Sequence, residues 1–356
     1  MTDKPYTSYL VEQPWLPFSE ALFDWDEDFH QLMLNDHIRM QCYEKAIKET
    51  VNPGDVVVDL GTGTGVLSLW ALEAGASRVY GIDMDQDILA VATAKMKEHG
   101  FGNRFIPVNQ LSYLVELPHK PDVLISEIMG NILDNEDFQP ILADAIQRLL
   151  KPEGKKIPLS ASSYIVPVTA EKAQEAVLSG NVCTMGNHYS LDRMLADKGV
   201  TDPCNLYYDT IIPLSSYLSS PQQLRQYSDN WDQLSTYERE LRFEMSCAGE
   251  FTGFKTYFIA QLSDHTILDI SSDDISGRQS SDSWKHAYLP LSKSISVQPG
   301  DTIYLLFARF YQRDHNLENE SLKQVYRWQG HLVRDGDVIS SFYQSMEDTR
   351  ILANTA

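Results

Sequence analysis

The sequence predicts an α/β fold in which a doubly wound parallel sheet is followed by antiparallel β-structure. Between residues 52 and 157, short apolar runs alternate with helical runs, an order that is typical of parallel βαβ units. After about residue 158, apolar and polar residues alternate instead, and turn signals such as Gln298-Pro299-Gly300 separate many of the runs. This second pattern favours antiparallel strands in a barrel or a sandwich.

Chain length and charge indicate a two-domain protein with an affinity for cations. A chain of 356 residues is too long for one compact core by the usual scaling of domain size. It carries 29 basic and 50 acidic residues, which gives a net charge of −21. Such a surface repels nucleic acid and anionic membranes, so neither is an expected partner, and it attracts cationic ligands. The same acidity also serves solubility, and the two explanations are compatible.

The cysteines and the N-terminal residues predict a cytoplasmic protein. The chain has four scattered cysteines, which are Cys42, Cys183, Cys204 and Cys247. They form no CxxC pair and no metal-site spacing, so we expect reduced thiols and no bound metal. The N-terminus lacks the basic and apolar regions of a signal peptide. No apolar run reaches the roughly 18 to 20 residues that a membrane span needs.

The first half opens with a lead segment over 1–28 and a helix over 29–50, whose apolar residues recur on one face. A turn at Asn52-Pro53-Gly54 precedes the alternating strands and helices. These are a strand over 56–60, a glycine loop over 61–65, a helix over 66–74, a strand over 78–82, a helix over 87–99, a strand over 121–126 and a helix that begins at 138.

A helical insert interrupts the antiparallel strands of the second half. It covers about residues 170–202 and is too long for a hairpin turn, so we expect it to protrude or to pack on a partner. Among the residues of the strands, Tyr288, Tyr304 and Phe307 fit the core of the β domain. His286 is expected at the surface.

The stretch "VVVDLGTGTGVL" predicts a nucleoside-type cofactor site. It places Asp59, Gly61, Gly63 and Gly65 at the carboxyl end of the first strand, where glycines let a ligand approach the backbone closely. Asp83 ends the second strand, and an acid there suits a ribose diol. A dinucleotide site requires the spacing G-x-G-x-x-G, whereas this loop has G-x-G-x-G led by an acid. The pattern therefore favours S-adenosylmethionine, whose amino group and sulfonium tolerate a nearby aspartate.

Two acids follow the later strand of the same sheet. Glu127 comes directly after the strand, and Glu136 lies a short loop beyond it, with Gly130 available for a bend. Ligands of open α/β sheets bind at the carboxyl edge of the strands, which is where both acids would meet. Carboxylates pair bidentately with the planar donors of a guanidinium. Methyl transfer would then need in-line positioning and a carboxylate to accept a proton.

The acids of this loop also permit a simpler explanation. Asp134, Asn135, Glu136 and Asp137 precede an apolar helix, where such residues often serve as N-caps. We expect Asp134 and Asp137 to be caps of this kind. Glu127 and Glu136 are predicted to be functional because of their places in the sheet and the loop.

Together with these features, three motifs resemble the protein arginine N-methyltransferase family. "SEIMGNILDNE" is similar to its double-glutamate loop, "MLNDHIRMQCY" to the helix before its cofactor loop, and "SWKHAYLPL" to its Thr-His-Trp loop. The resemblance implies a class I Rossmann-like methyltransferase domain followed by an antiparallel β-barrel. The insert then corresponds to a helical dimerisation arm, which implies a homodimer.

The resemblance also implies roles for individual residues. Arg39 would contact the carboxylate of the cofactor, Met33 would line the cofactor and substrate sites, and Trp284 would line the substrate site. At the position of the family's adenine-contacting acid, this chain has Ser112 and Tyr113. Tyr113 would either stack on adenine or cover the edge of the sheet.

The chain departs from the family pattern around the acceptor pocket. Ile128 and Asn131 replace a tryptophan and a tyrosine of the double-glutamate loop. Ser283 replaces the histidine of the Thr-His-Trp loop, so the usual pairing with the acid that corresponds to Asp36 is expected to be missing. His286 is a candidate to stand in for that histidine, but a surface position is the preferred interpretation.

The sequence thus predicts an S-adenosylmethionine-dependent N-methyltransferase that acts on a guanidino nitrogen of arginine in a protein, a peptide or a small molecule. The predicted divisions are a lead segment over 1–28, a methyltransferase domain over 29–157 and a β domain over 158–356 with its arm at about 170–202. Two alternatives are a small-molecule amine N-methyltransferase of natural-product biosynthesis and a non-catalytic cofactor-binding scaffold.

Overall fold

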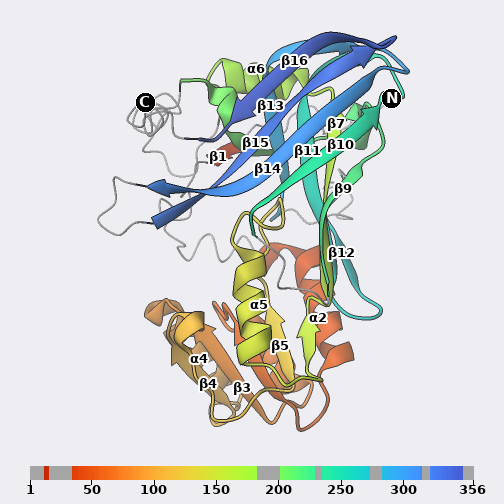
Figure 1. The fold of residues 1–356 in the computed structure, drawn as a ribbon. Helices are drawn as coiled ribbons and strands as arrows, with labels where there is room; N and C mark the ends of the chain where they lie inside the picture. The colour runs from red at the N-terminus through yellow and green to blue at the C-terminus, as the bar shows by residue number, and fades with distance from the viewer. Residues whose placement is uncertain are drawn as a thin grey trace.

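The protein consists of a parallel sheet with helices at one end and of long antiparallel strands at the other, as Figure 1 shows for the computed structural model. The structure describes residues 12–15, 34–182, 201–228, 235–272, 283–314 and 321–347. Within these residues, no helix is long and apolar enough to cross a membrane.

The parallel sheet has five strands in the order β4-β3-β2-β5-β6. They are β2 (Val56–Leu60), β3 (Arg78–Asp83), β4 (Phe105–Asn109), β5 (Val123–Ser126) and β6 (Lys155–Ile157). Every neighbouring pair is parallel. The central strands β2, β3 and β5 are mostly apolar and buried, as is typical of parallel sheets. The chain order reverses beside β2, so the carboxyl ends of β2, β3 and β5 flank a topological switch point.

Among the described residues, this half has four α-helices, and two of them start at a side-chain cap. They are α2 (His37–Thr50), α3 (Val66–Glu73), α4 (Gln86–Glu98) and α5 (Phe138–Arg148). Asp85 caps α4 by accepting hydrogen bonds from the backbone N–H groups of Asp87 and Ile88. Asp36 caps α2 in the same way. Residues 29–33 of the predicted first helix lie outside the described residues.

The second half contains two antiparallel sheets, which confirms the predicted change of architecture. One sheet has the order β1-β8-β13-β11-β7-β9 with β12 on β11, and the other has the order β10-β14-β15-β16. The strands are β1 (Glu12–Trp15), β7 (Ser160–Val168), β8 (Tyr207–Thr210), β9 (Gln222–Tyr227), β10 (Tyr237–Glu244), β11 (Gly249–Gln261), β12 (Ile267–Asp269), β13 (His286–Val297), β14 (Thr302–Asp314), β15 (Ser321–Arg334) and β16 (Asp337–Ser345).

A single buried cluster joins the two antiparallel sheets. Phe251 and Leu289 from one sheet share it with Phe243, Phe307 and Trp328 from the other. A separate buried cluster extends from the parallel sheet to Phe258 and Trp284 in the antiparallel half. The edge between the two halves is therefore a packed interface of apolar side chains.

The N-terminal segment contains a strand where the sequence predicted only a lead segment. β1 pairs with β8 in antiparallel register, with Trp15 opposite Tyr207. The pairing satisfies backbone groups at an edge of the sheet that would otherwise be exposed. Because its partner lies almost 200 residues away, the local sequence did not indicate this strand.

The predicted arm begins with a short helix that packs on the chain's own β domain. This helix, α6 (Glu171–Leu178), contacts β11 and β13. Gln174 donates a 2.7 Å hydrogen bond from Nε2 to the carbonyl of Leu291, and Val177 is buried. Residues 183–200 of the predicted arm lie outside the described residues.

Two predictions about individual residues of the β domain were wrong. Tyr304 is 40% exposed because it projects from the outer face of β14, where it stacks on His331. His286 is fully buried, and its Nδ1 accepts a 3.0 Å hydrogen bond from the backbone N–H of Ile212. Burial holds the pKa of His286 well below its usual value. Tyr288 and Phe307 are buried, as predicted.

Candidate functional site

The glycine loop joins β2 to α3 in a conformation that requires glycine. Gly61, Gly63 and Gly65 have φ values of 72°, 49° and 78°, in the left-handed region that side chains disfavour. A Cβ atom at Gly65 would lie 2.9 Å from Cβ of Ala92, and one at Gly61 would lie 3.2 Å from Cγ2 of Ile128. The loop therefore packs closely against α4 and against the residue that follows Glu127.

Asp59 lies at the end of β2 and is fully buried. Its Oδ2 accepts hydrogen bonds from the hydroxyls of Thr62 and Ser68, at 2.7 and 2.6 Å. Its Oδ1 is buried without a hydrogen-bond partner among the described residues. Burial raises the pKa of Asp59 to about 6. A bound donor group would satisfy the remaining oxygen and favour the charged carboxylate.

Asp83 lies at the end of β3 and connects that strand to the glycine loop. Its Oδ2 accepts a 2.9 Å hydrogen bond from the backbone N–H of Gly63, and its Oδ1 accepts one of 3.0 Å from Asp85. Each carboxylate oxygen can accept more than one hydrogen bond, so Asp83 retains capacity for a ligand hydroxyl.

Ser112 and Tyr113 lie in the short helix η3 (Ser112–Leu114), beyond the end of β4. The carbonyl of Ser112 accepts a 2.6 Å hydrogen bond from Nη2 of Arg148, which fixes the turn. The side chain of Tyr113 is 43% exposed. Partial burial still raises the pKa of its hydroxyl. Met33 lies outside the described residues.

Glu127 follows β5 and forms a buried ion pair with Arg39 of α2. Both side chains are only 10% exposed. The guanidinium of Arg39 lies over the ring of Trp284, 4.4 Å from its centroid, and its Nη1 is 3.4 Å from the hydroxyl of Ser283. The structure thus brings together an acid, an aromatic ring and a hydroxyl around one guanidinium. Together with Arg39, they come from three segments that are far apart in the sequence.

Glu136 acts on the same guanidinium electrostatically. Its residue surface is partly exposed, but its carboxylate lies deep enough that burial raises the pKa to about 7. The positive charge of Arg39 opposes this shift. For Arg39 itself, burial lowers the pKa to about 10, and the charge of Glu136 is among the effects that oppose it. Both predicted acids therefore lie within electrostatic reach of one cation.

The loop that contains Ser283 keeps a contact that the sequence predicted to be lost. The backbone N–H of Ser283 donates to Oδ2 of Asp36 at 3.0 Å, and its hydroxyl donates to the same oxygen at 2.6 Å. Serine therefore links to the acid that the missing histidine would have contacted. Trp284 is also fixed, because its Nε1 donates a 2.7 Å hydrogen bond to the carbonyl of Met129. Its ring packs edge-on against Phe258.

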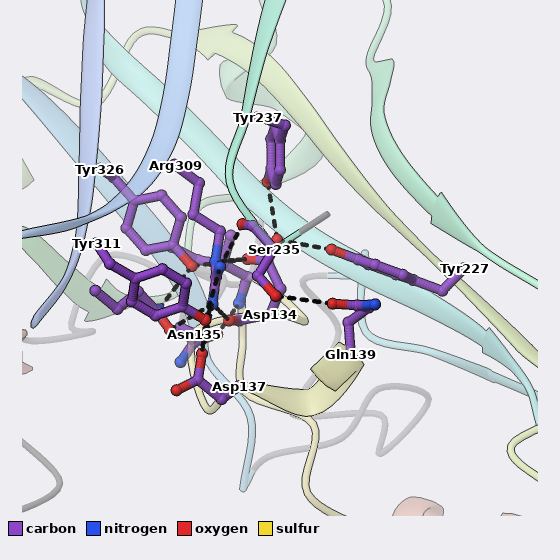
Figure 2. A network of polar contacts seen from close by, with 12 residues as sticks. Asp134, Asn135, Asp137, Gln139, Tyr227, Ser235, Tyr237, Arg309, Tyr311 and Tyr326 are labelled. Carbon is purple, nitrogen blue, oxygen red and sulfur yellow. Dashed lines mark hydrogen bonds and ion pairs between the residues drawn. The ribbon is translucent and has the colours of Figure 1, made fainter. Parts of the chain in front are cut away.

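Asp134 and Asp137 are not the helix caps that the sequence predicted. Asp137 occupies the cap position of α5 with φ of 54°, and its side chain makes no capping hydrogen bond. Figure 2 shows that Asp134 instead contacts tyrosines of the antiparallel sheets and that Asp137 contacts Arg309. Arg309 was not predicted from the sequence, since nothing in β14 indicates a partner more than 170 residues earlier in the chain.

Two protein-family models match overlapping parts of the chain. The description "Ribosomal protein L11 methyltransferase" matches residues 38–175, and "PRMT5 oligomerisation domain" matches residues 160–325. A probable protein arginine N-methyltransferase 6.2 of Oryza sativa subsp. indica is 38% identical over 151 residues, which are 42% of this chain. The chain spans 38% of the length of that relative.

Solved structures have the same fold over most of the chain. An enzyme–prozyme heterotetrameric complex of Trypanosoma brucei PRMT1 with AdoHcy has a TM-score of 0.72 and covers 90% of this chain and 99% of its own. Arabidopsis thaliana protein arginine methyltransferase 10, in an open conformation, has a TM-score of 0.71 and covers 89% and 97%. Both are 20% identical in sequence to this chain.

The fold is therefore that of a Rossmann-like methyltransferase sheet followed by an antiparallel β domain. Over part of its sequence and in its architecture, the chain is similar to protein arginine N-methyltransferases.

Proposed function

We propose that the chain is an S-adenosylmethionine-dependent N-methyltransferase that acts on a guanidino nitrogen of arginine in a protein, a peptide or a small molecule. The observation that carries the proposal is the buried guanidinium of Arg39, which pairs with Glu127 and lies over Trp284. Carboxylates and aromatic faces are the groups that recognise guanidinium ions. The side chains beside the double-glutamate loop thus have the chemistry of a guanidinium receptor.

The glycine loop and its acids fit S-adenosylmethionine. Asp59 has one buried oxygen without a partner in the described part of the chain, which suits the amino group of this cofactor. Asp83 retains capacity for the ribose hydroxyls, and Arg39 would hold the cofactor carboxylate. When bound, the cofactor supplies an electrophilic methyl group. The cofactor would approach the backbone closely at Gly61, Gly63 and Gly65. Its adenine base would lie near Ser112 and Tyr113.

Glu127 and Glu136 would hold the acceptor guanidinium between them. Their charges would orient the planar cation and concentrate its positive charge away from the nitrogen that is methylated. As that nitrogen forms its bond to carbon, it loses a proton. Glu136 is suited to accept this proton because its pKa of about 7 lies near physiological pH. Trp284, and Met33 by resemblance, would form walls of the pocket.

The proposal includes the predicted organisation of the chain. A lead segment over 1–28 and a cofactor domain over 29–157 precede a β domain over 158–356 with its arm. We expect a cytoplasmic homodimer. Support for an oligomer comes from the match of residues 160–325 to an oligomerisation domain and from the heterotetrameric state of the Trypanosoma brucei complex.

A second candidate is a non-catalytic, cofactor-binding partner of an active methyltransferase. The ion pair between Arg39 and Glu127 favours it, because Glu127 is engaged by the chain itself. The Trypanosoma brucei complex is described as an enzyme with a prozyme, so an assembly of this kind exists for a protein with the same fold.

The test is a product analysis with three classes of acceptor. The protein is incubated with S-adenosylmethionine and either free arginine, an arginine-containing peptide or a simple amine, and mass spectrometry locates the added methyl group. The proposed function predicts methylation of a guanidino nitrogen. Methylated amine without any guanidino product would contradict it. Cofactor binding without product from any acceptor would favour the non-catalytic role.

A further inference from the structure

Asp134 is the centre of a buried polar network between the double-glutamate loop and both antiparallel sheets (Figure 2). Its Oδ2 accepts hydrogen bonds from the hydroxyls of Tyr227 in β9 and Tyr237 in β10, each at 2.9 Å. Its Oδ1 accepts a third, at 2.7 Å, from Tyr326 in β15. Burial, together with the carboxylate of Asp134, raises the pKa of all three hydroxyls, so they remain donors.

Arg309 of β14 binds the same loop on both sides of Glu136. Its Nη2 donates to the carbonyl of Asp134 at 2.9 Å and to Oδ1 of Asp137 at 2.8 Å. It also donates to the side chain of Gln324 at 2.7 Å, and Nη1 donates to the carbonyl of Ser235. The side chain of Arg309 is only 1% exposed. A guanidinium buried in this way is held in one geometry by its acceptors.

The segment that these contacts hold has an unfavourable backbone conformation. Leu133 has φ of 85° and Asp137 has φ of 54°, values in the left-handed region that residues with a side chain disfavour. Strain of this kind persists only where surrounding contacts determine the conformation. Glu136 lies between these two strained residues. Its place therefore depends on contacts that the loop cannot supply itself.

A further contact anchors the first part of the loop. Nδ2 of Asn131 donates a 2.5 Å hydrogen bond to Oδ1 of Asp209 in β8. The loop is thus bound to five strands of the β domain, namely β8, β9, β10, β14 and β15.

We propose that Asp134 and Arg309 are positioning residues, which set the location of Glu136 by fixing its loop to the two antiparallel sheets. Neither contacts the predicted reacting groups. They would hold Glu136, at one end of the loop, opposite Arg39 and Glu127, which lie at its other end. The predicted effect of these residues on catalysis rests on the proposed function. Their role in anchoring the loop is independent of that function.

The first experiment replaces Arg309 by methionine, which has a similar length and no charge. We expect the amides of residues 130–137 to exchange with deuterium at least about tenfold faster, while those of β2 and β3 are unchanged. Because small misplacements of a catalytic group can cost about 10²-fold, we expect kcat to fall by about that factor. The dissociation constant of S-adenosylhomocysteine should change by less than about twofold, since no cofactor residue is altered.

A second, milder variant covers the case in which Arg309→Met fails to fold. Tyr311→Phe removes one hydroxyl that donates to Oδ1 of Asp137 and lies 3.3 Å from Nη2 of Arg309. We expect this variant to show faster exchange of residues 130–137 and a lower kcat, both by smaller factors than in Arg309→Met. The control is Arg327→Met in β15, whose ion-pair partners among the described residues are Glu238 and Glu347 and not the loop. It should change neither the exchange of residues 130–137 nor kcat.

A pH profile separates positioning from general destabilisation. Burial raises the pKa of Glu136 to about 7. A variant with a loosened loop exposes this carboxylate, so the pKa of Glu136 that appears in its profile of kcat/KM should fall below 7. Unchanged exchange of the loop in Arg309→Met and Tyr311→Phe would overturn the inference. So would losses of kcat in Arg327→Met that match those in Arg309→Met. If the unaltered protein transfers no methyl group, the proposed function fails, and loop exchange alone decides whether Arg309 anchors the loop.

Discussion

At the scale of single residues, the two acids of the loop lie in different electrostatic surroundings. Glu127 forms an ion pair with Arg39. For Glu136, burial raises the pKa, and the charge of Arg39 lowers it by a smaller amount. Two carboxylates with different environments can divide the work of binding a cation and accepting its proton.

The pKa of Glu136 predicts how activity depends on pH. The carboxylate form is required to bind a guanidinium, and protonation removes it as the pH falls through about 7. The value of kcat/KM for the acceptor should therefore decrease below about pH 7, because this parameter reports the free enzyme. The profile of kcat should decrease at a lower pH, since a bound cation lowers the pKa of the acid. A profile of kcat/KM that stays flat down to about pH 5.5 would contradict this role.

The hydrogen bonds of Ser283 predict a measurable role for its hydroxyl. Ser283→Ala removes the 2.6 Å hydrogen bond to Asp36 and the contact with Arg39 but keeps the backbone N–H donor. The free energy of unfolding should fall by about 1 kcal/mol, and kcat/KM by roughly fivefold. Denaturant unfolding and steady-state kinetics check both values. Ser283→Thr retains a hydroxyl and is the control. Equal losses in the two variants would show that the hydroxyl is not responsible.

These residue contacts mark the limit of what the sequence could reveal. The motif predicted a position for Ser283 and the loss of a histidine contact. It did not predict that serine would reach Asp36, because the pairing depends on how two segments 247 residues apart approach each other. Asp134 was misassigned for the same reason. Its position before a helix predicted a cap, but tyrosines of both antiparallel sheets bind it instead.

At the scale of elements, most of the parallel half was predicted because its signals are local, but its two edge strands, β4 and β6, were not. Strands β2, β3 and β5 and helices α3 and α4 lie within one or two residues of the predicted ranges. β1 was missed because an edge strand of four residues has little pattern of its own and needs its partner. The glycine loop was predicted, and the structure shows why Gly65 cannot carry a side chain, since its backbone packs against Ala92.

Two glycines with nearly the same backbone conformation provide a test of that packing. Gly65 and Gly100 have φ values of 78° and 79°, but only at Gly65 would a Cβ atom meet a neighbour within 3 Å. Gly100→Ala should cost about 1 to 2 kcal/mol from backbone strain alone. Gly65→Ala should cost at least about 1 kcal/mol more, because Ala92 must move. The difference is measured by denaturant unfolding with unchanged m values. Equal losses would mean that the contact is relieved without cost.

At the scale of the whole molecule, the candidate acceptor site combines both halves of the chain. The parallel half supplies Arg39, Glu127 and Glu136, and the antiparallel half supplies Ser283 and Trp284. The network of Asp134 and Arg309 fastens the loop between them. The sequence predicted the two kinds of sheet and the acids. It could not predict this junction, which consists of side-chain contacts between residues that are far apart along the chain.

The most direct test of the central claim is methyl transfer to an arginine acceptor by a variant with both Glu127→Gln and Glu136→Gln. Each substitution removes a charge-assisted contact worth about 1.5 to 3 kcal/mol, so the rate should fall by about 10²- to 10⁴-fold. Calorimetry with S-adenosylhomocysteine is the control and should show that cofactor binding is not weakened. Transfer to the guanidino nitrogen at the rate of the unaltered protein would contradict the account.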